Sequence, residues 1–161
     1  MTNTSQHRRI VIGRYEGIDV LNPAILAIPS KTDTGAFRSA IHATDIRIVR
    51  TKEGRFLKCK LLGHRCYPES FDFKTKRFEK VAIRNSFGHR ENRYEVSLRI
   101  KLGPRVFTTN FTLADRSESV FPVLMGRKLM RGRFLVDPGE AGIDRVELKK
   151  RYNITTPDEE D

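Results

Sequence analysis

Nine residues, from Tyr94 to Leu102, alternate between apolar and polar side chains without a break. Because successive side chains of a strand point to opposite faces, this pattern predicts a strand with one apolar face and one face in water. Shorter signals of the same kind recur along the chain, separated by turn residues. The other expected strands cover residues 10–12, 18–21, 24–28, 39–49, 55–62, 81–83, 107–113 and 134–136. With one short helix expected at residues 126–132, the chain is predicted to be an all-β barrel or sandwich.

The length of 161 residues is enough for one core, and we expect a single domain over residues 9–140. Residues 1–8 are expected to form a disordered N-terminus, and residues 141–161 a C-terminal extension with an acidic tail. Between residues 63 and 78 the alternation is lost, so this stretch is expected to be a long loop or insertion without regular structure.

The sequence favours a cytoplasmic protein without a membrane partner. No apolar run approaches the roughly eighteen residues that a membrane-spanning helix needs, and the polar N-terminus has no signal-peptide core. The two cysteines, Cys59 and Cys66, are expected to be reduced thiols.

Two short stretches carry the functional interpretation. The strand expected at residues 24–28 leads into Thr32-Asp33-Thr34-Gly35-Ala36, which delivers an aspartate at a strand end and follows it with a glycine turn. About ninety residues later, a second apolar run ends in Val123-Leu124-Met125-Gly126-Arg127-Lys128-Leu129. Asp and Gly are common turn residues, so the first stretch alone also fits an ordinary turn.

Asp-Thr-Gly followed by apolar-apolar-Gly-Arg resembles the retropepsin-like aspartic peptidases, single-domain enzymes that work as dimers. The longer strings at residues 31–43 and 124–138 resemble a bacterial family known as ATP-dependent zinc proteases. Its members are often described as associated with RimK, a glutamate ligase that acts on a ribosomal protein. The resemblance covers residues 10–140 and implies a retropepsin-like closed barrel or sandwich with one short C-terminal helix.

The resemblance also implies a mechanism. Peptide hydrolysis by aspartate needs two carboxylates that share one proton around a water molecule, one acting as base and the other as acid. The chain holds one Asp-Thr-Gly, because Asp115 is followed by Arg116 and Asp137 by a proline. We therefore expect a homodimer in which Asp33 of each subunit faces its copy across a two-fold axis.

Residues around Asp33 are expected to support the site if the resemblance holds. Gly35 would turn its N–H toward the carboxylate, and the Thr34 hydroxyl would hydrogen-bond across the dimer. The second stretch would pack under the aspartate loop, with Gly126 allowing close backbone approach. The expected supporting residues are Thr34, Gly35, Ala36, Leu124, Met125, Gly126 and Arg127.

Retropepsins close a mobile hairpin, the flap, over the bound peptide. The best match in this chain is residues 81–94, with Asn85, Ser86, Phe87 and Gly88 at the tip as expected substrate-binding residues. An ordinary hairpin with one surface aromatic is the alternative.

The sequence predicts neither a metal site nor a cofactor, despite the zinc in the family name. The four histidines are widely spaced, and the spacing of Cys59, His64 and Cys66 matches no familiar site. No phosphate-binding glycine-rich loop is recognisable.

The net charge is +11, from 31 Lys and Arg against 20 Asp and Glu. Such charge attracts polyanions, and it would steer an acidic peptide substrate toward the protein. The basic residues look scattered along the sequence, which does not favour a nucleic-acid partner.

The leading hypothesis is a homodimeric aspartic endopeptidase acting on a peptide or protein, and not a zinc protease. The alternative is a non-catalytic retropepsin-like binding or adaptor module associated with a RimK-type glutamate ligase or a ribosomal partner. The substitution Asp33→Asn separates them, because it should abolish hydrolysis while leaving binding intact.

Overall fold

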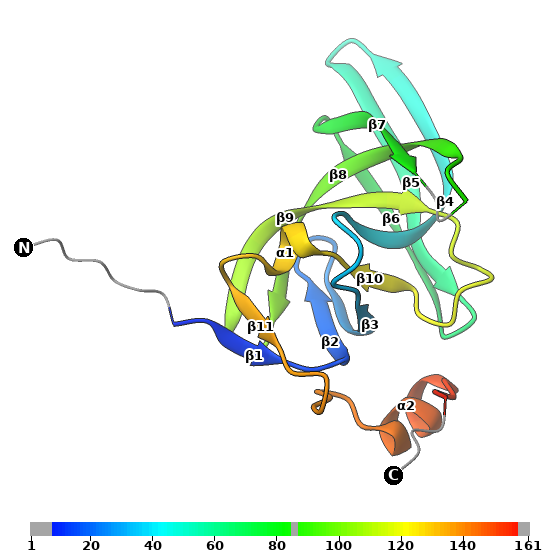
Figure 1. Cartoon of the computed structure of the whole chain (residues 1–161). Coiled ribbons are helices and arrows are strands. Elements are labelled where there is room, and N and C mark those ends of the chain that lie inside the picture. Colours follow the sequence, from blue (N-terminus) through cyan, green and yellow to red (C-terminus); the bar gives the residue numbers. More distant parts are fainter. Residues whose placement is uncertain (1–7, 85–86, 158–161) are drawn as a thin grey trace, which may run out of the picture.

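The computed structural model describes residues 8–84 and 87–157. Its elements, in chain order, are β1 (Ile10–Ile12), β2 (Tyr15–Val20), β3 (Ile25–Thr32), β4 (Ser39–Thr51), β5 (Gly54–His64), β6 (Tyr67–Thr75), β7 (Phe78–Arg84), β8 (Arg90–Leu102), β9 (Arg105–Ala114), β10 (Val123–Met125), α1 (Arg127–Met130), β11 (Phe134–Val136) and α2 (Arg145–Tyr152) (Figure 1). Every strand expected from the alternation of apolar and polar residues is present.

Strands β10, β3, β2, β8, β9 and β4 pair in that order and close into a barrel, because β4 also pairs with β10. The pairs β3–β10 and β4–β9 are parallel, and the other barrel pairs are antiparallel. The expected all-β closed barrel is therefore confirmed. Its closing strand, β10, comes from the second of the two sequence stretches.

Strand β4 belongs to the barrel at its start and leaves it at its end. Residues 39–42 pair with β9, whereas the strand from Ala43 onward pairs with β5. A bulge separates Thr44 from Arg47, and Asp45 inside it has a left-handed backbone (φ 53°). Strand β6 then adds to β5, and the resulting three-stranded sheet projects beyond the barrel (Figure 1).

Strand β8 also extends past the barrel. Its first half pairs with β7 in an antiparallel hairpin, from Phe78 opposite Val96 to Arg84 opposite Arg90. This is the hairpin expected as the flap, and residues 85 and 86 at its tip lie outside the described residues.

The expectation of an irregular stretch at residues 63–78 is wrong, because β5 continues to His64 and β6 fills most of the remainder. In β6 the half-buried Phe71 and Phe73 alternate with exposed, charged neighbours. Strand β6 is an edge strand that pairs only with β5 among the described strands. Proline has no N–H to donate, so an edge strand, with one side unpaired, tolerates Pro68.

The expected helix at residues 126–132 is shorter than predicted, and α1 makes a single turn. A second helix, α2, was not predicted. The Asp144 side chain accepts the N–H of Glu147 at 2.8 Å, which caps the start of α2. Asn153 takes a left-handed backbone (φ 55°) and ends the helix.

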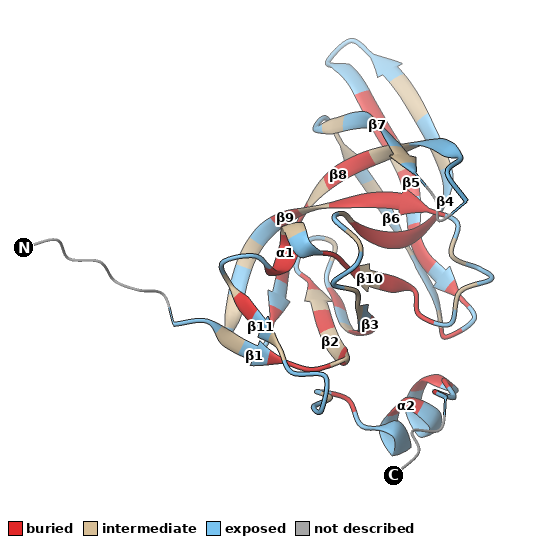
Figure 2. Cartoon of the chain, viewed as in Figure 1, coloured by how far each residue is buried: buried red, intermediate tan, exposed pale blue. Residues whose placement is uncertain are grey.

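The main hydrophobic core joins residues of the barrel strands to residues of β5, and buried positions recur along these strands (Figure 2). A second cluster joins the C-terminal segment to the outside of β2 and β3. Its buried members are Tyr15, Cys66, Phe121, Ile143, Leu148, Tyr152 and Ile154. The Tyr152 hydroxyl also donates to the carbonyl of Ala27 at 2.6 Å. The segment after residue 140 is therefore packed onto the barrel.

Two further sequence expectations concern the ends of the chain. Residues 1–7 and 158–161, where disorder was expected, lie outside the described part. Within that part, neither helix has the length and apolar character needed to cross a membrane.

Candidate active site

The fold brings the two sequence stretches into direct contact. Parallel pairing sets Met125 opposite Thr32, so that β3 and β10 end together. The next residue, Asp33, donates its backbone N–H to the carbonyl of Met125 at 2.9 Å. The aspartate is thus held at a strand end, against the glycine that follows β10.

The Asp33 carboxylate is oriented by its own loop. Its Oδ1 accepts the backbone N–H of Gly35 at 2.9 Å, and its carbonyl accepts the N–H of Ala36 at 3.3 Å. Asp33 is half-buried, whereas Thr34 and Gly35 are exposed. The loop therefore fixes one carboxylate oxygen and leaves exposed residues beside it.

Close backbone packing joins this loop to the start of α1. A Cβ on Gly126 would lie 2.6 Å from the carbonyl oxygen of Arg38, so only glycine fits there. Arg127 donates its backbone N–H to Ala36 at 2.8 Å and its guanidinium to the carbonyl of Thr34 at 3.0 Å. Arg127 therefore braces the aspartate loop from outside.

Arg38 ties the same loop to β8 through a buried carboxylate. Its guanidinium pairs with Glu95, which is only 6% exposed. Asn110 donates to Glu95 at 3.2 Å, and the Lys128 ammonium lies 3.7 Å away. The alternation of β8 predicted that Glu95 lies on the face in water. In the structure the Glu95 side chain is buried, because Arg38 and Lys128 cover it.

A cavity of about 390 Å³ opens beside Asp33. Residues from the aspartate loop, the β7–β8 hairpin, β9, β10 and the loop after β9 line it. They are Asp33, Gly35, Ala36, Phe37, Arg38, Ala40, Ala82, Ile83, Arg84, Arg93, Thr112, Arg116 and Leu124. Among these residues Asp33 is the only carboxylate, and four are arginines.

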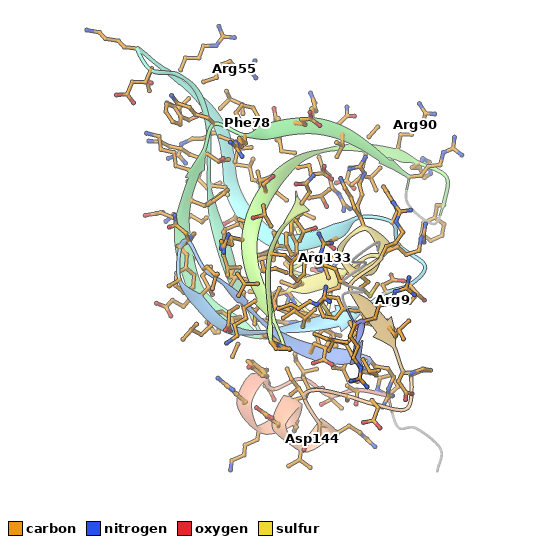
Figure 3. The ribbon with its side chains drawn as sticks, turned by 90° about the vertical axis from the view of Figure 1, so that its left-hand side faces the viewer. Arg9, Arg55, Phe78, Arg90, Arg133 and Asp144 are labelled. Atoms are coloured by element: carbon orange, nitrogen blue, oxygen red, sulfur yellow. The ribbon has the colours of Figure 1, made fainter. Side chains whose placement is uncertain are left out.

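The stem of the β7–β8 hairpin borders the cavity. Ala82, Ile83 and Arg84 come from β7, and Arg93 comes from β8. Phe87, expected to cover a peptide, is 85% exposed, and neither it nor Gly88 lines the cavity in this single chain. Asn85 and Ser86 lie outside the described residues, and Arg90 marks where β8 begins near the tip (Figure 3).

The arginines give the cavity a positive wall. Burial, followed by the charge of Arg93, lowers the pKa of Arg116, and the Asp33 carboxylate opposes this shift. The Nε–H of Arg93 is buried and has no hydrogen-bond partner among the described residues. The Arg93 guanidinium also pairs with Glu91 of the same strand at 3.1 Å.

Two buried histidines hold the loop that carries Arg116. His42 Nδ1 accepts the backbone N–H of Arg116 at 2.9 Å. His64 Nε2 lies 2.9 Å from the carbonyls of Arg116 and Ser119, while its Nδ1 accepts the N–H of Cys66. These contacts require both rings to be neutral, with the proton on Nε2, and burial lowers the pKa of each.

The described part of the chain contains no group of three or more His, Cys, Asp or Glu side chains that could hold a metal ion. Burial raises the pKa of Cys59 to about 12, so its thiol stays protonated. His64 and Cys66 are near in space because the backbone N–H of Cys66 donates to His64 Nδ1.

Sequence reasoning identified Asp33 and its neighbours but did not predict Arg84, Arg93 or Arg116 as residues of the site. A polar loop, residues 115–119, carries Arg116, and nothing in its composition separates it from other surface loops. The pairing of β4 with β9 and β10 is what directs this loop to the cavity.

Comparison with known proteins agrees with this geometry. A family model described as "Retropepsin-like aspartic endopeptidase RimB" matches residues 11–147. Probable alpha-L-glutamate ligases of Parasynechococcus marenigrum and Shewanella pealeana are each 28% identical, over 81% and 92% of this chain. The chain spans only 28% and 33% of the length of these relatives. A Legionella pneumophila crystal structure of unknown function matches with a TM-score of 0.66 and 25% identity, covering 83% of this chain and 97% of that one.

Proposed function

Because the chain belongs to the RimB-like family of retropepsin-like aspartic endopeptidases, we propose that it hydrolyses peptide bonds with Asp33 as its catalytic carboxylate. The observation that carries the proposal is the position of Asp33 at the edge of the 390 Å³ cavity, with Oδ1 held by the N–H of Gly35. A carboxylate fixed at a cavity wall is oriented toward a water or a bound peptide before the substrate arrives.

The proposed chemistry requires a second copy of the chain. The residues lining the cavity include no other carboxylate, so the partner subunit would supply the second aspartate. Two carboxylates within a few ångströms share one proton, and the ionised one removes a proton from the attacking water. The protonated one donates its proton to the carbonyl oxygen. The pair titrates as a unit, so neither copy has a pKa of its own.

We further propose that the substrate is acidic. Arg84, Arg93 and Arg116 line the cavity, and the guanidinium group of an arginine donates well to a carboxylate. An Arg–carboxylate pair of this kind is strong and directional. The relatives named as glutamate ligases support a glutamate-containing peptide, with a RimK-type ligase or a ribosomal protein as partner. Both cysteines are free thiols, which is consistent with a cytoplasmic location.

The first test is hydrolysis of a glutamate-rich peptide by wild-type protein and by Asp33→Asn. We expect the substitution to reduce kcat on the order of a thousandfold or more. Asp137→Asn is the matched control, because Asp137 is exposed and lies outside the cavity lining. Light scattering on the same samples should detect a dimer. Full activity of Asp33→Asn would overturn the proposal.

Arg93→Gln tests the substrate class separately. We expect it to raise KM about tenfold or more for the acidic peptide, because a charged hydrogen bond is lost, and to leave a neutral peptide of equal length unaffected. An equal increase in KM for both peptides would contradict the proposal of an acidic substrate. It would leave the proposed role of Asp33 unaffected.

An adaptor without catalysis is the second candidate, supported by the glutamate-ligase names of relatives that are about three times longer than this chain. Under this alternative, wild-type protein and Asp33→Asn bind the acidic peptide equally, and neither cleaves it.

A further inference from the structure

The sheet formed by β4, β5 and β6, with the two residues that follow it, carries more than half of the net positive charge of the molecule. Residues 45–60 and 72–77 together hold nine Lys or Arg and three Asp or Glu, which accounts for more than half of the net charge of +11. The basic residues look scattered along the sequence, but pairing of the three strands gathers them on a sheet that projects from the barrel (Figure 1). Arg55, near the outer end of this sheet, lies 5.4 Å from the ring centroid of Phe78, the first residue of β7 (Figure 3).

The register of this sheet puts like charges side by side. Arg47 lies directly opposite Lys58 on β5, and Lys58 lies directly opposite Lys74 on β6. Neighbouring strands are about 4.8 Å apart, and like charges directly opposite each other destabilise a sheet. Asp45 pairs with Arg47 at 2.6 Å, which leaves the two lysines adjacent. The arrangement is unfavourable for folding and favourable for holding an anion.

A third lysine, Lys76, lies on the same face of the sheet as Lys74, because both ammonium groups contact the ring of Phe56. The Lys74 ammonium lies 4.0 Å and the Lys76 ammonium 5.1 Å from the centroid of the Phe56 ring. Phe56 is 8% exposed, so the lysine stems cover the ring and hold both ammonium groups near Lys58. A hollow of about 320 Å³ on this face is lined by four cationic residues, two aspartates, a cysteine and an aromatic residue, which are Arg47, Lys58, Lys60, Lys74, Asp45, Asp72, Cys59 and Phe73. We call Arg47, Lys58, Lys74 and Lys76 the basic sheet face.

The chemistry of the basic sheet face favours phosphate over an acidic protein as its ligand. Protein–protein interfaces bury a central group of apolar and aromatic side chains. None of the large exposed apolar residues of the described chain lies between residues 45 and 77. Protein–nucleic acid interfaces are strongly positive and polar, and contacts to the phosphate backbone need only such charges.

We propose that the basic sheet face binds the phosphate backbone of RNA without reading its sequence. None of its residues lines the cavity beside Asp33, so a substrate peptide and an RNA strand occupy separate surfaces. The covered ring of Phe56 offers no stacking surface to a base, which explains why the contact is to phosphates. The inference does not depend on the proposed peptidase activity.

The test measures binding of a fluorescein-labelled 20-nucleotide uridine RNA at several salt concentrations. The test variant combines Lys58→Gln, Lys74→Gln and Lys76→Gln. The control variant combines Arg99→Gln, Lys101→Gln and Lys150→Gln, which are exposed, lie outside the basic sheet face and remove the same charge. Each lost contact to a single strand lowers the slope of log K against log salt by about 0.7.

We expect the test variant to bind RNA at least about tenfold more weakly at 50 mM salt, with a salt slope lower by about two. The control variant should bind within about twofold of wild type. An equal loss in both variants would show that only net charge matters, and would overturn the inference. Wild-type protein that does not bind RNA at low salt would overturn it as well.

A polyglutamate peptide serves as the competing ligand of another class. If the test variant loses affinity for polyglutamate and keeps its affinity for RNA, the face is a protein-binding surface and the inference is wrong. Thermal unfolding checks that both triple variants are folded. Because like charges are removed from one sheet, the melting temperature of the test variant should equal or exceed that of wild type.

Discussion

Gly126 is the residue on which the contact between the two halves of the candidate site depends. Its backbone N–H donates to the buried Ser39 hydroxyl at 3.0 Å, and its Cα faces the carbonyls of Phe37 and Arg38. A methyl group in that position would meet the Arg38 carbonyl oxygen at 2.6 Å. Since both neighbours are backbone, no side chain can rotate away to make room.

We therefore expect Gly126→Ala to lower the free energy of unfolding by at least about 2 kcal/mol, because the aspartate loop must move away from α1. Urea denaturation measures this loss. Gly17→Ala is the control, because a Cβ there would make an ordinary 3.6 Å contact with Ile143. Equal stability of the two variants would contradict the close packing described for Gly126.

Sequence reasoning could find Asp33 and Gly126 because each depends on short-range chemistry. A strand end followed by a glycine turn is a local pattern, and so is an apolar run that ends in glycine. Glu95 shows the limit of that reasoning. Its place in an alternating strand predicts exposure, but Arg38 and Lys128, far away in the sequence, cover it.

At the scale of elements, β6 and α2 were missed for different reasons. Strand β6 has one half-buried face, which carries Phe71 and Phe73, and a proline and polar residues interrupt the apolar pattern over the rest of the strand. Helix α2 buries only two residues and has almost no apolar face, although Asp144 and Glu147 do form a capping pair. Both elements are stabilised by what they pack against more than by their own pattern.

The register of the β4–β5–β6 sheet predicts that replacing Lys58 and replacing Lys60 by glutamate change the free energy of unfolding in opposite directions. Lys58 lies between Arg47 and Lys74, whereas Lys60 lies opposite Asp72. Lys58→Glu should raise the free energy of unfolding by about 0.5 kcal/mol, because it replaces two like-charge neighbours by two attractive ones. Lys60→Glu should lower it by a similar amount.

The two substitutions make the same change in charge on the same strand, so each is the control for the other. Thermal unfolding at low salt measures both, and the difference should shrink as salt is added. Two shifts of the same sign would mean that net charge, rather than register, governs the stability of this sheet.

At the scale of the whole molecule, the barrel brings together positions that the sequence keeps apart. The cavity takes residues from the aspartate loop, the β7–β8 hairpin and the loop that carries Arg116. Because β10 closes the barrel, the aspartate loop has a fixed position relative to the loop that carries Arg116. The fold class and the catalytic candidate could be predicted, but the arginine wall could not, because it exists only after three distant segments meet.

The histidines that hold the Arg116 loop make the stability of the whole chain depend on pH. Burial lowers the pKa of His42 and of His64 in the folded protein, and the charge of the His64 ring adds to the shift of His42. Asp115 opposes the shift of His42. The hydrogen bonds to the carbonyls of Ser119 and Arg116 oppose the shift of His64, whereas the charges of Arg65 and Arg116 add to it. The unfolded chain therefore binds more protons than the folded chain once the pH falls below about 6.5.

Stability should accordingly be constant above about pH 7 and fall as the pH decreases through 6.5, by up to about 1.4 kcal/mol per pH unit for each histidine. Urea denaturation between pH 5 and pH 8 measures this slope. Asn at position 42 keeps an acceptor for the N–H of Arg116 but cannot take up a proton in this range, so His42→Asn should remove its share of the slope. If that variant kept the full slope, His42 would not be one of the groups responsible, and the loop would be held by other contacts.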